Sequence, residues 1–151
     1  MMAAYPDTSF LCALYRHQAN SARAAAYFQS MPGPLEVTTL LLYEFKQSVR
    51  FQIRLHRLDP KRGFPKPEGL KMLADLKSDL ISGAVTVIPA PWPQVHGAAE
   101  RLSELYTDAT GHRCMDILHV ATAIELGVRE FLTFDGNQRK LAEAEGLVVP
   151  L

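Results

Sequence analysis

The segment of residues 113–137 (RCMDILHVATAIELGVREFLTFDGN) most constrains how this chain can fold. Its apolar residues recur at helical spacing in the first half, which predicts a helix that is buried on most sides. Gly127 is placed to end this helix, and residues 129–134 form a short β-prone run. The segment therefore indicates a helix followed by a strand, with Asp116 in the first helical turn and Asp135 at the carboxyl end of the strand.

The same alternation of strands and helices runs through the rest of the sequence. Further strands are expected at residues 2–5, 35–38, 84–88 and 147–149, with helices in most of the segments between them. Strands that alternate with helices favour right-handed crossovers and a parallel sheet. We therefore predict an α/β fold with three layers (α/β/α), in which helices cover both faces of a mainly parallel sheet of four to five strands.

The length and composition limit the class of protein. A chain of 151 residues is expected to form a single domain, residues 1–151, with a substantial core. Its net charge is zero, so any binding of nucleic acid must come from a local basic patch. Two cysteines without metal-ligand spacing fit a reduced, cytoplasmic compartment. We expect no membrane association, because no apolar run approaches the roughly 20 residues of a membrane span and the first residues lack the pattern of a signal peptide.

Three aspartates occupy the ends of the predicted elements. Asp7 follows the first strand, and with Asp116 and Asp135 it is expected at the carboxyl edge of the sheet, where ligands of α/β proteins bind. Each also has a structural explanation, because aspartate is a preferred N-cap and complements the helix dipole. Asp135 and Gln138 even have the spacing of a capping box. Taken singly, each aspartate is weak evidence for function, and capping is the favoured interpretation of Asp7.

Glu44 is harder to explain as a structural residue. It follows the second strand, on a helical row that is otherwise mostly apolar, where an unpaired carboxylate is costly to bury. The four acids are then expected at one edge of the sheet, where a hard divalent cation such as Mg²⁺ or Mn²⁺ would relieve their mutual repulsion. The alternative is four scattered structural residues. The acids of this predicted metal site are Asp7, Glu44, Asp116 and Asp135.

Four short motifs resemble those of a known family. They are Asp7-Thr8-Ser9, Tyr43-Glu44, the run DILHVATA at residues 116–123, and the run LTFD at residues 132–135. In this order and spacing, over nearly the whole chain, they resemble a PIN domain, and most closely the VapC-type toxin ribonucleases of toxin–antitoxin pairs. A proline directly before Asp7 departs from the aliphatic residue that is usual there.

The resemblance implies a Mg²⁺- or Mn²⁺-dependent endoribonuclease in which the same four acids hold one or two ions. It also implies an antitoxin protein and a second copy of the chain as partners. Asn137 stands where some members have a further acid, so its role as a ligand stays open, as does that of Thr8. The hydroxyls of Thr8, Ser9 and Thr133 are candidates to orient water or phosphate, although a hydroxyl beside a helix start is more often a cap. His119 is expected to be packed or hydrogen-bonded in the core. The alternative is a non-catalytic PIN-like domain that binds RNA or acts as a scaffold.

A row of cations follows Glu44 on the long helix predicted over residues 39–58, before an irregular segment at residues 59–67. Its members are spaced by four, four, three and four residues and would share one face if the helix persists. They are Lys46, Arg50, Arg54, Arg57 and Lys61. Such a row is usually just a solvated face, but beside a site that hydrolyses phosphodiesters it is a plausible track for an RNA backbone. We assign Arg50, Arg54, Arg57 and Lys61 to RNA binding, with a surface that faces the antitoxin or a second copy as the alternative.

Overall fold

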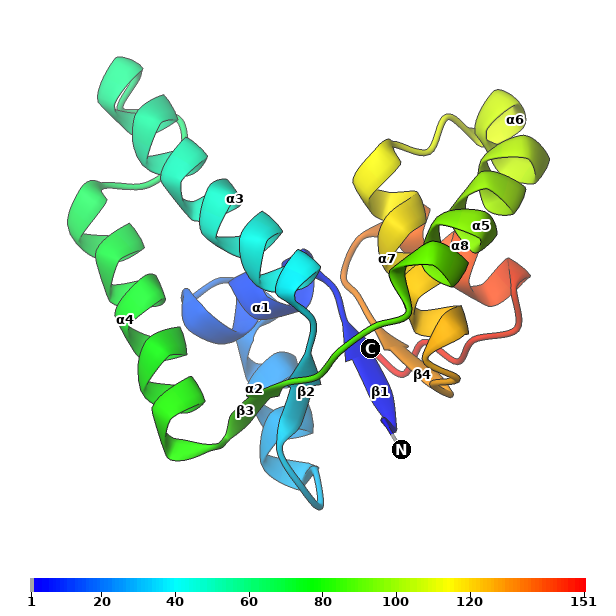
Figure 1. The fold of residues 1–151 in the computed structure, drawn as a ribbon. Coiled ribbons are helices and arrows are strands. Elements are labelled where there is room, and N and C mark those ends of the chain that lie inside the picture. The colour runs from blue at the N-terminus through cyan, green and yellow to red at the C-terminus, as the bar shows by residue number, and fades with distance from the viewer. Residues whose placement is uncertain (1) are drawn as a thin grey trace. The chain divides into compact units, whose positions relative to one another are not determined.

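The computed structural model describes residues 2–151, which form two compact units. The first unit contains the chain up to Phe10 together with residues 88–151, and the second contains residues 11–87. Helix α1 (Thr8–Tyr15) runs from the first unit into the second. Figure 1 shows the elements of both units.

The first unit is built around a parallel strand pair and a buried helix. Strand β1 (Ala4–Pro6) pairs with β4 (Glu130–Leu132), which places Tyr5 opposite Phe131. Helix α5 (Trp92–Leu102) continues into the π-helix η1 (Ser103–Thr107) and the short α6 (Asp108–Thr110). Helices α7 (Cys114–Glu125) and α8 (Gly136–Ala144) complete the unit.

Helix α7 confirms the prediction made from its periodicity. Most of its second and third turns are buried, and they pack with apolar side chains of α5, β1, β4 and α8 in one cluster. The helix ends before Gly127, which has a φ of 67°, a conformation that glycine adopts without strain. Asp116 lies in the first turn, as predicted. Burial of this helix therefore fixes the start of α7 relative to β1 and β4 within the first unit.

The second unit contains a long helical hairpin and a second strand pair. Strand β2 (Leu35–Val37) pairs in parallel with β3 (Val85–Val87). Helix α2 (Ser21–Ser30) precedes β2, and helices α3 (Thr39–Leu58) and α4 (Lys66–Ser82) form the hairpin between the two strands (Figure 1). The buried faces of α3 and α4 carry residues such as Phe45, Val49 and Leu76. Apolar burial along one face of each helix therefore holds the hairpin to the rest of this unit.

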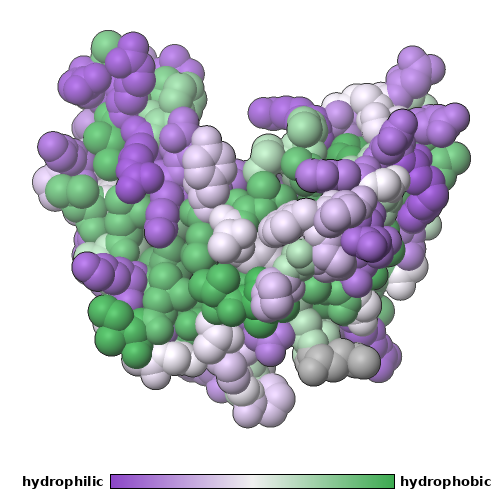
Figure 2. Space-filling view, in the orientation of Figure 1, coloured by the Kyte–Doolittle hydropathy of each residue, from purple (hydrophilic) through white to green (hydrophobic). Residues whose placement is uncertain are grey.

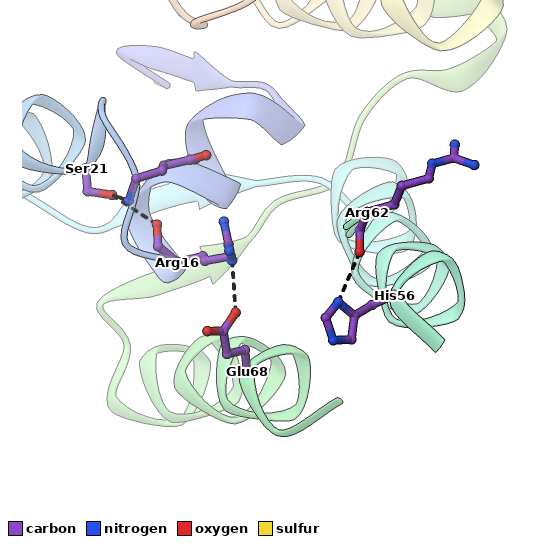
Figure 3. A network of polar contacts seen from close by, with 6 residues as sticks. Arg16, Ser21, His56, Arg62 and Glu68 are labelled. Atoms are coloured by element: carbon purple, nitrogen blue, oxygen red, sulfur yellow. Dashed lines mark hydrogen bonds and ion pairs between the residues drawn. The ribbon is translucent and has the colours of Figure 1, made fainter. Parts of the chain in front are cut away.

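Polar contacts add to this packing within the second unit. The guanidinium of Arg16, just after α1, pairs with Glu68 of α4 at 3.3 Å (Figure 3). It also lies over the ring of Phe64, 5.0 Å from the ring centroid. The Tyr15 hydroxyl donates a hydrogen bond to Asp79 at 2.7 Å. These contacts fix the end of α1 against α4.

The sheet agrees with the prediction in direction but not in extent. Both strand pairs are parallel and alternate with helices, so the α/β class is confirmed. The single sheet of four to five strands is not confirmed, because the strands of residues 2–151 form two separate pairs. At the predicted last strand, only Val148 forms an isolated bridge, to Glu130. The strands are three residues long, so most of the regular structure is helical.

Helix α3 carries the basic row only as far as Arg57. Helix α3 ends at Leu58, as the sequence indicates, so the condition for a shared face is not met at Lys61, which lies in the turn that leads to α4. Asp59 has extended backbone angles (φ −148°, ψ 109°) because it precedes Pro60, which disfavours the helical conformation. Arg50, Arg54 and Arg57 remain on the helix and are exposed. Within residues 2–151, none of the helices offers an apolar stretch that would cross a lipid bilayer.

The turn between α3 and α4 generates a stability prediction at Gly63. This residue has a φ of 57°, and a Cβ atom built on it would lie 2.0 Å from the Gln52 carbonyl oxygen. The adjacent Arg62 carbonyl accepts a hydrogen bond from the His56 ring at 3.1 Å, which ties the same turn to α3 (Figure 3). We expect Gly63→Ala to lower the free energy of unfolding by about 3 kcal/mol or more, since the backbone must move as well as adopt a strained φ.

Gly83→Ala is the matched control for this prediction. Gly83 also has a positive φ, of 81°, but nothing lies within 4 Å of its built Cβ. Its replacement should cost only about 1 kcal/mol, the strain of the left-handed backbone alone. Urea denaturation of the two variants measures the difference, and equal losses would contradict the close approach at Gly63.

Candidate functional site

Asp7 is a fully buried carboxylate at the start of α1. Its side chain is 0% exposed, and the residue lies directly after β1 and directly before α1. Oδ1 accepts hydrogen bonds from the Phe10 backbone N–H at 3.0 Å and from the Ser9 hydroxyl at 2.6 Å. The bond from Phe10 is the one that an N-cap side chain accepts, so the structural role of Asp7 as a cap is confirmed, while its role as a metal ligand stays a prediction.

Thr133 joins Asp7 to the loop that follows β4. The Thr133 hydroxyl donates to Oδ2 of Asp7 and accepts from the backbone N–H of Asp135 at 2.9 Å. The Ser9 hydroxyl accepts from the Phe134 backbone N–H at 2.9 Å. Ser9 and Thr133 were expected to orient water or phosphate, and in the structure their hydroxyls position the Asp7 carboxylate and this loop.

Asp135 is the N-cap of α8. Its Oδ1 accepts from the backbone N–H groups of Asn137 at 2.9 Å and Gln138 at 3.0 Å. The reciprocal half of a capping box is not formed, because the N–H of Asp135 donates to Thr133 instead. The Gln138 side chain is buried, and its Oε1 has no hydrogen-bond partner among residues 2–151. The cap uses one oxygen of Asp135, while the residue itself is exposed and its Oδ2 has no hydrogen-bond donor within the described chain.

The other two predicted acids lie on helices. Asp116 is half-buried in the first turn of α7, in the same unit as Asp7 and Asp135. Glu44 is half-buried on α3, in the second unit, next to the buried Phe45. Within residues 2–151, no three His, Cys, Asp or Glu side chains are gathered closely enough to hold a metal ion. The convergence of all four acids therefore stays a prediction.

The chemistry of the donors nevertheless fits a hard divalent cation. Carboxylate oxygens are the ligands that Mg²⁺ and Mn²⁺ prefer. A carboxylate offers about four acceptor positions, and three at Asp7 are taken by Ser9, Phe10 and Thr133. Thr8, beside Asp7, has a buried hydroxyl without a hydrogen-bond partner in residues 2–151. By this count, the Asp7 carboxylate has about one acceptor position left for a further contact.

Burial sets the protonation of Asp7. It raises the pKa of the Asp7 carboxyl from 3.8 to about 6, and the hydrogen bonds from Ser9, Thr133 and Phe10 offset part of this rise. The nearby His119 ring also favours the charged form. Desolvation is the largest cause of the raised pKa of Asp7. At neutral pH, Asp7 is therefore mostly ionised, and the burial of its charge lowers the free energy of unfolding.

His119 is a core residue, as the sequence predicted. It is fully buried, and its Nδ1 lies 2.7 Å from the Tyr5 hydroxyl. Tyr5 in turn stacks on Phe131 with ring centroids 5.8 Å apart. The polar role of Tyr5 was missed, because its partner is 114 positions away and no local pattern signals such a contact.

Comparison with known proteins identifies the fold. Residues 4–144 match the model of the PIN domain, a range that spans both units. The chain belongs to the PIN domain family. The match confirms the resemblance that the four motifs carry.

Solved structures of VapC toxins and of toxin–antitoxin complexes are similar to this PIN domain over nearly its whole length. VapC20 of Mycobacterium tuberculosis, a Sarcin-Ricin loop cleaving toxin, is 22% identical over 97% of each chain, with a TM-score of 0.64. FitAcB of Neisseria gonorrhoeae is 15% identical over 97% of this chain and 95% of its own, with a TM-score of 0.63. VapBC2 of Rickettsia felis, bound to a DNA fragment from its promoter, is 14% identical over 98% and 97%, with a TM-score of 0.63. Among curated protein sequences, none matches this chain.

The buried Asp7 generates a prediction for the pH dependence of stability in metal-free buffer. Because the folded pKa is about 6 and the ordinary value is 3.8, the folded state binds more protons than the unfolded state between these values. Wild-type stability should therefore fall as pH rises from 4 to 7, by up to about 3 kcal/mol from this group. Asp7→Asn keeps the cap without the charge, so its stability relative to wild type should rise over the same interval.

Urea denaturation in EDTA at pH 4, 5, 6 and 7 measures this difference. Ser9→Ala is the control, because it keeps the carboxyl but removes a hydrogen bond that favours the ionised form. Its stability should fall more steeply with pH than that of the wild type. A constant difference between Asp7→Asn and wild type across the interval would contradict the raised pKa.

Proposed function

We propose that this PIN domain is a metal-dependent endoribonuclease and the toxin of a toxin–antitoxin pair. The observation that carries the proposal is the family match across residues 4–144. The ordered set of four acids supports it, because Asp7, Glu44, Asp116 and Asp135 occupy the positions that the resemblance assigns to metal ligands. The similarity to VapC20, a toxin that cleaves the Sarcin-Ricin loop, supports the choice of RNA as the substrate.

The four acids would hold one or two Mg²⁺ or Mn²⁺ ions. Such an ion lowers the pKa of a bound water and stabilises charge on the phosphate that is cleaved. The residues of the chain prepare the ligands: Ser9 and Thr133 fix the orientation of the Asp7 carboxylate by hydrogen bonds to both of its oxygens. At neutral pH, Asp7 is above its pKa of about 6 and presents a negative charge. This mechanism requires no side-chain nucleophile.

The partners follow from the same proposal. Toxin–antitoxin complexes from Klebsiella pneumoniae and Haemophilus influenzae are among the similar structures. We infer that this chain is likewise neutralised by a small antitoxin, forms a homodimer and acts on RNA in the cytoplasm. A neighbouring short reading frame whose product copurifies with this chain and suppresses its toxicity would test the biological role. A chain that is not toxic when produced alone would count against it.

Substitution of the acids tests the catalytic proposal. We expect Asp7→Asn, Glu44→Gln, Asp116→Asn and Asp135→Asn each to reduce Mg²⁺-dependent RNA cleavage by at least about a hundredfold, since a metal supplies several kcal/mol of transition-state stabilisation. Asparagine keeps the caps of α1 and α8, so melting temperatures without metal should stay close to the wild-type value or rise. Cleavage of a structured RNA and Mn²⁺ binding by calorimetry are the two measurements.

Asp108→Asn is the matched control, because it makes the same change at an exposed aspartate of α6. It should leave cleavage and Mn²⁺ binding unchanged. RNA binding without any Mg²⁺-dependent cleavage by the wild type would instead favour the non-catalytic PIN-like domain. A large loss of stability in the acid variants would mean that these side chains are chiefly structural.

The basic row is proposed to bind the RNA backbone. Changing Arg50, Arg54 and Arg57 together to Gln should weaken binding to unrelated RNAs alike, because contacts to phosphate do not read sequence. Each lost contact should lower the slope of log affinity against log salt by roughly 0.7 for a single strand. A triple change of Lys66, Lys71 and Lys77 to Gln on α4 removes the same charge and serves as the control. Equal slopes for the arginine variant and the wild type would show that the row does not bind RNA and is instead a solvated or partner-binding face.

A further inference from the structure

The exposed face of α3 carries large apolar side chains among its cations. Tyr43 is 67% exposed, Phe51 is 51% exposed and Leu58 is 65% exposed. Single exposed apolar residues are ordinary on a protein surface, but these three lie along one helix. Figure 2 shows hydrophilic and hydrophobic side chains intermixed over the helical hairpin of α3 and α4.

Helical geometry places the rings and the arginines side by side. At 3.6 residues per turn, Tyr43, Phe51 and Leu58 fall within an arc of about 120° that also contains Arg50, Arg54 and Arg57. The opposite side of α3 holds its buried residues: Leu41, Leu42, Phe45 and Val49. The mixed face therefore points away from the core of its own unit.

Glu44 is the one acidic residue of α3, and it lies near the start of the helix, before the three arginines. Between Phe45 and Leu58, α3 contains no acidic residue. Among the ion pairs and hydrogen bonds of residues 2–151, none involves the side chains of Arg50, Arg54 or Arg57. The fold itself thus leaves the three guanidinium groups available for a ligand.

We propose that this face of α3 binds single-stranded RNA, with bases stacked on Tyr43 and Phe51 and phosphates held by the three arginines. The proposal deepens the proposed function and rests on it for the choice of RNA. Aromatic rings on a cationic track are the arrangement by which proteins hold single strands, since every base has a face that can stack. A duplex keeps its bases stacked on one another and offers them to no side-chain ring.

Other occupants suit this face less well. A second copy of the chain packed symmetrically on it would bring arginines against arginines, which repel. An apolar helix from a partner needs a continuous apolar stripe, whereas the polar Gln47 lies between Tyr43 and Phe51 on the helical surface. Unpaired bases and phosphates match both kinds of side chain at once.

Removal of the rings, with the charges kept, tests the proposal. The double variant Tyr43→Leu/Phe51→Leu retains apolar side chains, and Tyr43→Phe/Phe51→Tyr retains both rings as the matched control. Fluorescence anisotropy measures affinity of the full chain for labelled 12-nucleotide oligouridylate and oligoadenylate. EDTA in the buffer prevents metal-dependent cleavage, so a failure of the nuclease proposal does not affect the result.

The leucine variant should bind both oligonucleotides at least about 25-fold more weakly, from a factor of about five for each lost stack. Its slope of log affinity against log salt should match the wild type, because the arginines remain, and its affinity for a 12-base-pair RNA duplex should not change. The ring-retaining variant should bind as the wild type does. Both substitutions lie on exposed positions, so circular dichroism melts should coincide.

Three results would overturn the proposal. In the first, the leucine variant binds the single strands as tightly as the wild type. In the second, it loses affinity for the duplex to the same extent, which would show that stacking is not involved. In the third, RNA affinity is unchanged while sedimentation shows a loss of self-association or a glutamate-rich peptide no longer binds, which would assign the face to a second copy or to an acidic partner.

Discussion

The candidate site depends on the hydrogen bonds that hold the buried carboxylate of Asp7. A charge without exposure to water is stable only when its oxygens are satisfied by the protein. Three donors meet this need: the Ser9 hydroxyl, the Phe10 backbone N–H and the Thr133 hydroxyl. Because Thr133 lies 126 positions from Asp7, this network joins the start of α1 to the loop after β4. The cap of α8 is attached to the same loop through the N–H of Asp135.

Structural and functional roles of these aspartates are compatible. The sequence presents capping and metal binding as alternatives, yet a carboxylate has two oxygens and several acceptor positions. Asp135 uses Oδ1 for the cap of α8, and Asp7 retains one position after its three hydrogen bonds. The cap also orients each carboxylate and reduces the entropy that a ligand would otherwise have to remove. Burial raises the pKa of Asp7 to about 6, and a bound cation would offset this cost of ionising the carboxyl.

The two sides of helix α3 differ in burial and in composition. Its buried residues pack into the second unit and stabilise the long helical hairpin. Its outer face carries three arginines and three exposed apolar side chains, none of which this packing requires. A helix of 20 residues supported along one side can present such a face without loss of stability.

The sequence by itself determined the local elements and the places of the acids along them. The apolar periodicity predicts α7, and Gly127, Asp7 and Asp135 mark element ends because these signals act over a few residues. The end of α3 at Leu58 also has a local cause, the proline after Asp59. The four motifs, in their order, also sufficed to indicate the PIN domain that the family match confirms.

Only the tertiary structure decided which partners these residues have. The bonds from Thr133 to Asp7 and from Tyr5 to His119 join positions more than a hundred residues apart, and no local pattern encodes them. The raised pKa of Asp7 likewise comes from burial, which depends on everything packed around it. The pairing of the strands could not be predicted from the sequence, because three-residue strands carry too few side chains to specify a register. Local chemistry fixes where an element starts and stops, whereas desolvation and long-range hydrogen bonds exist only once the chain has packed.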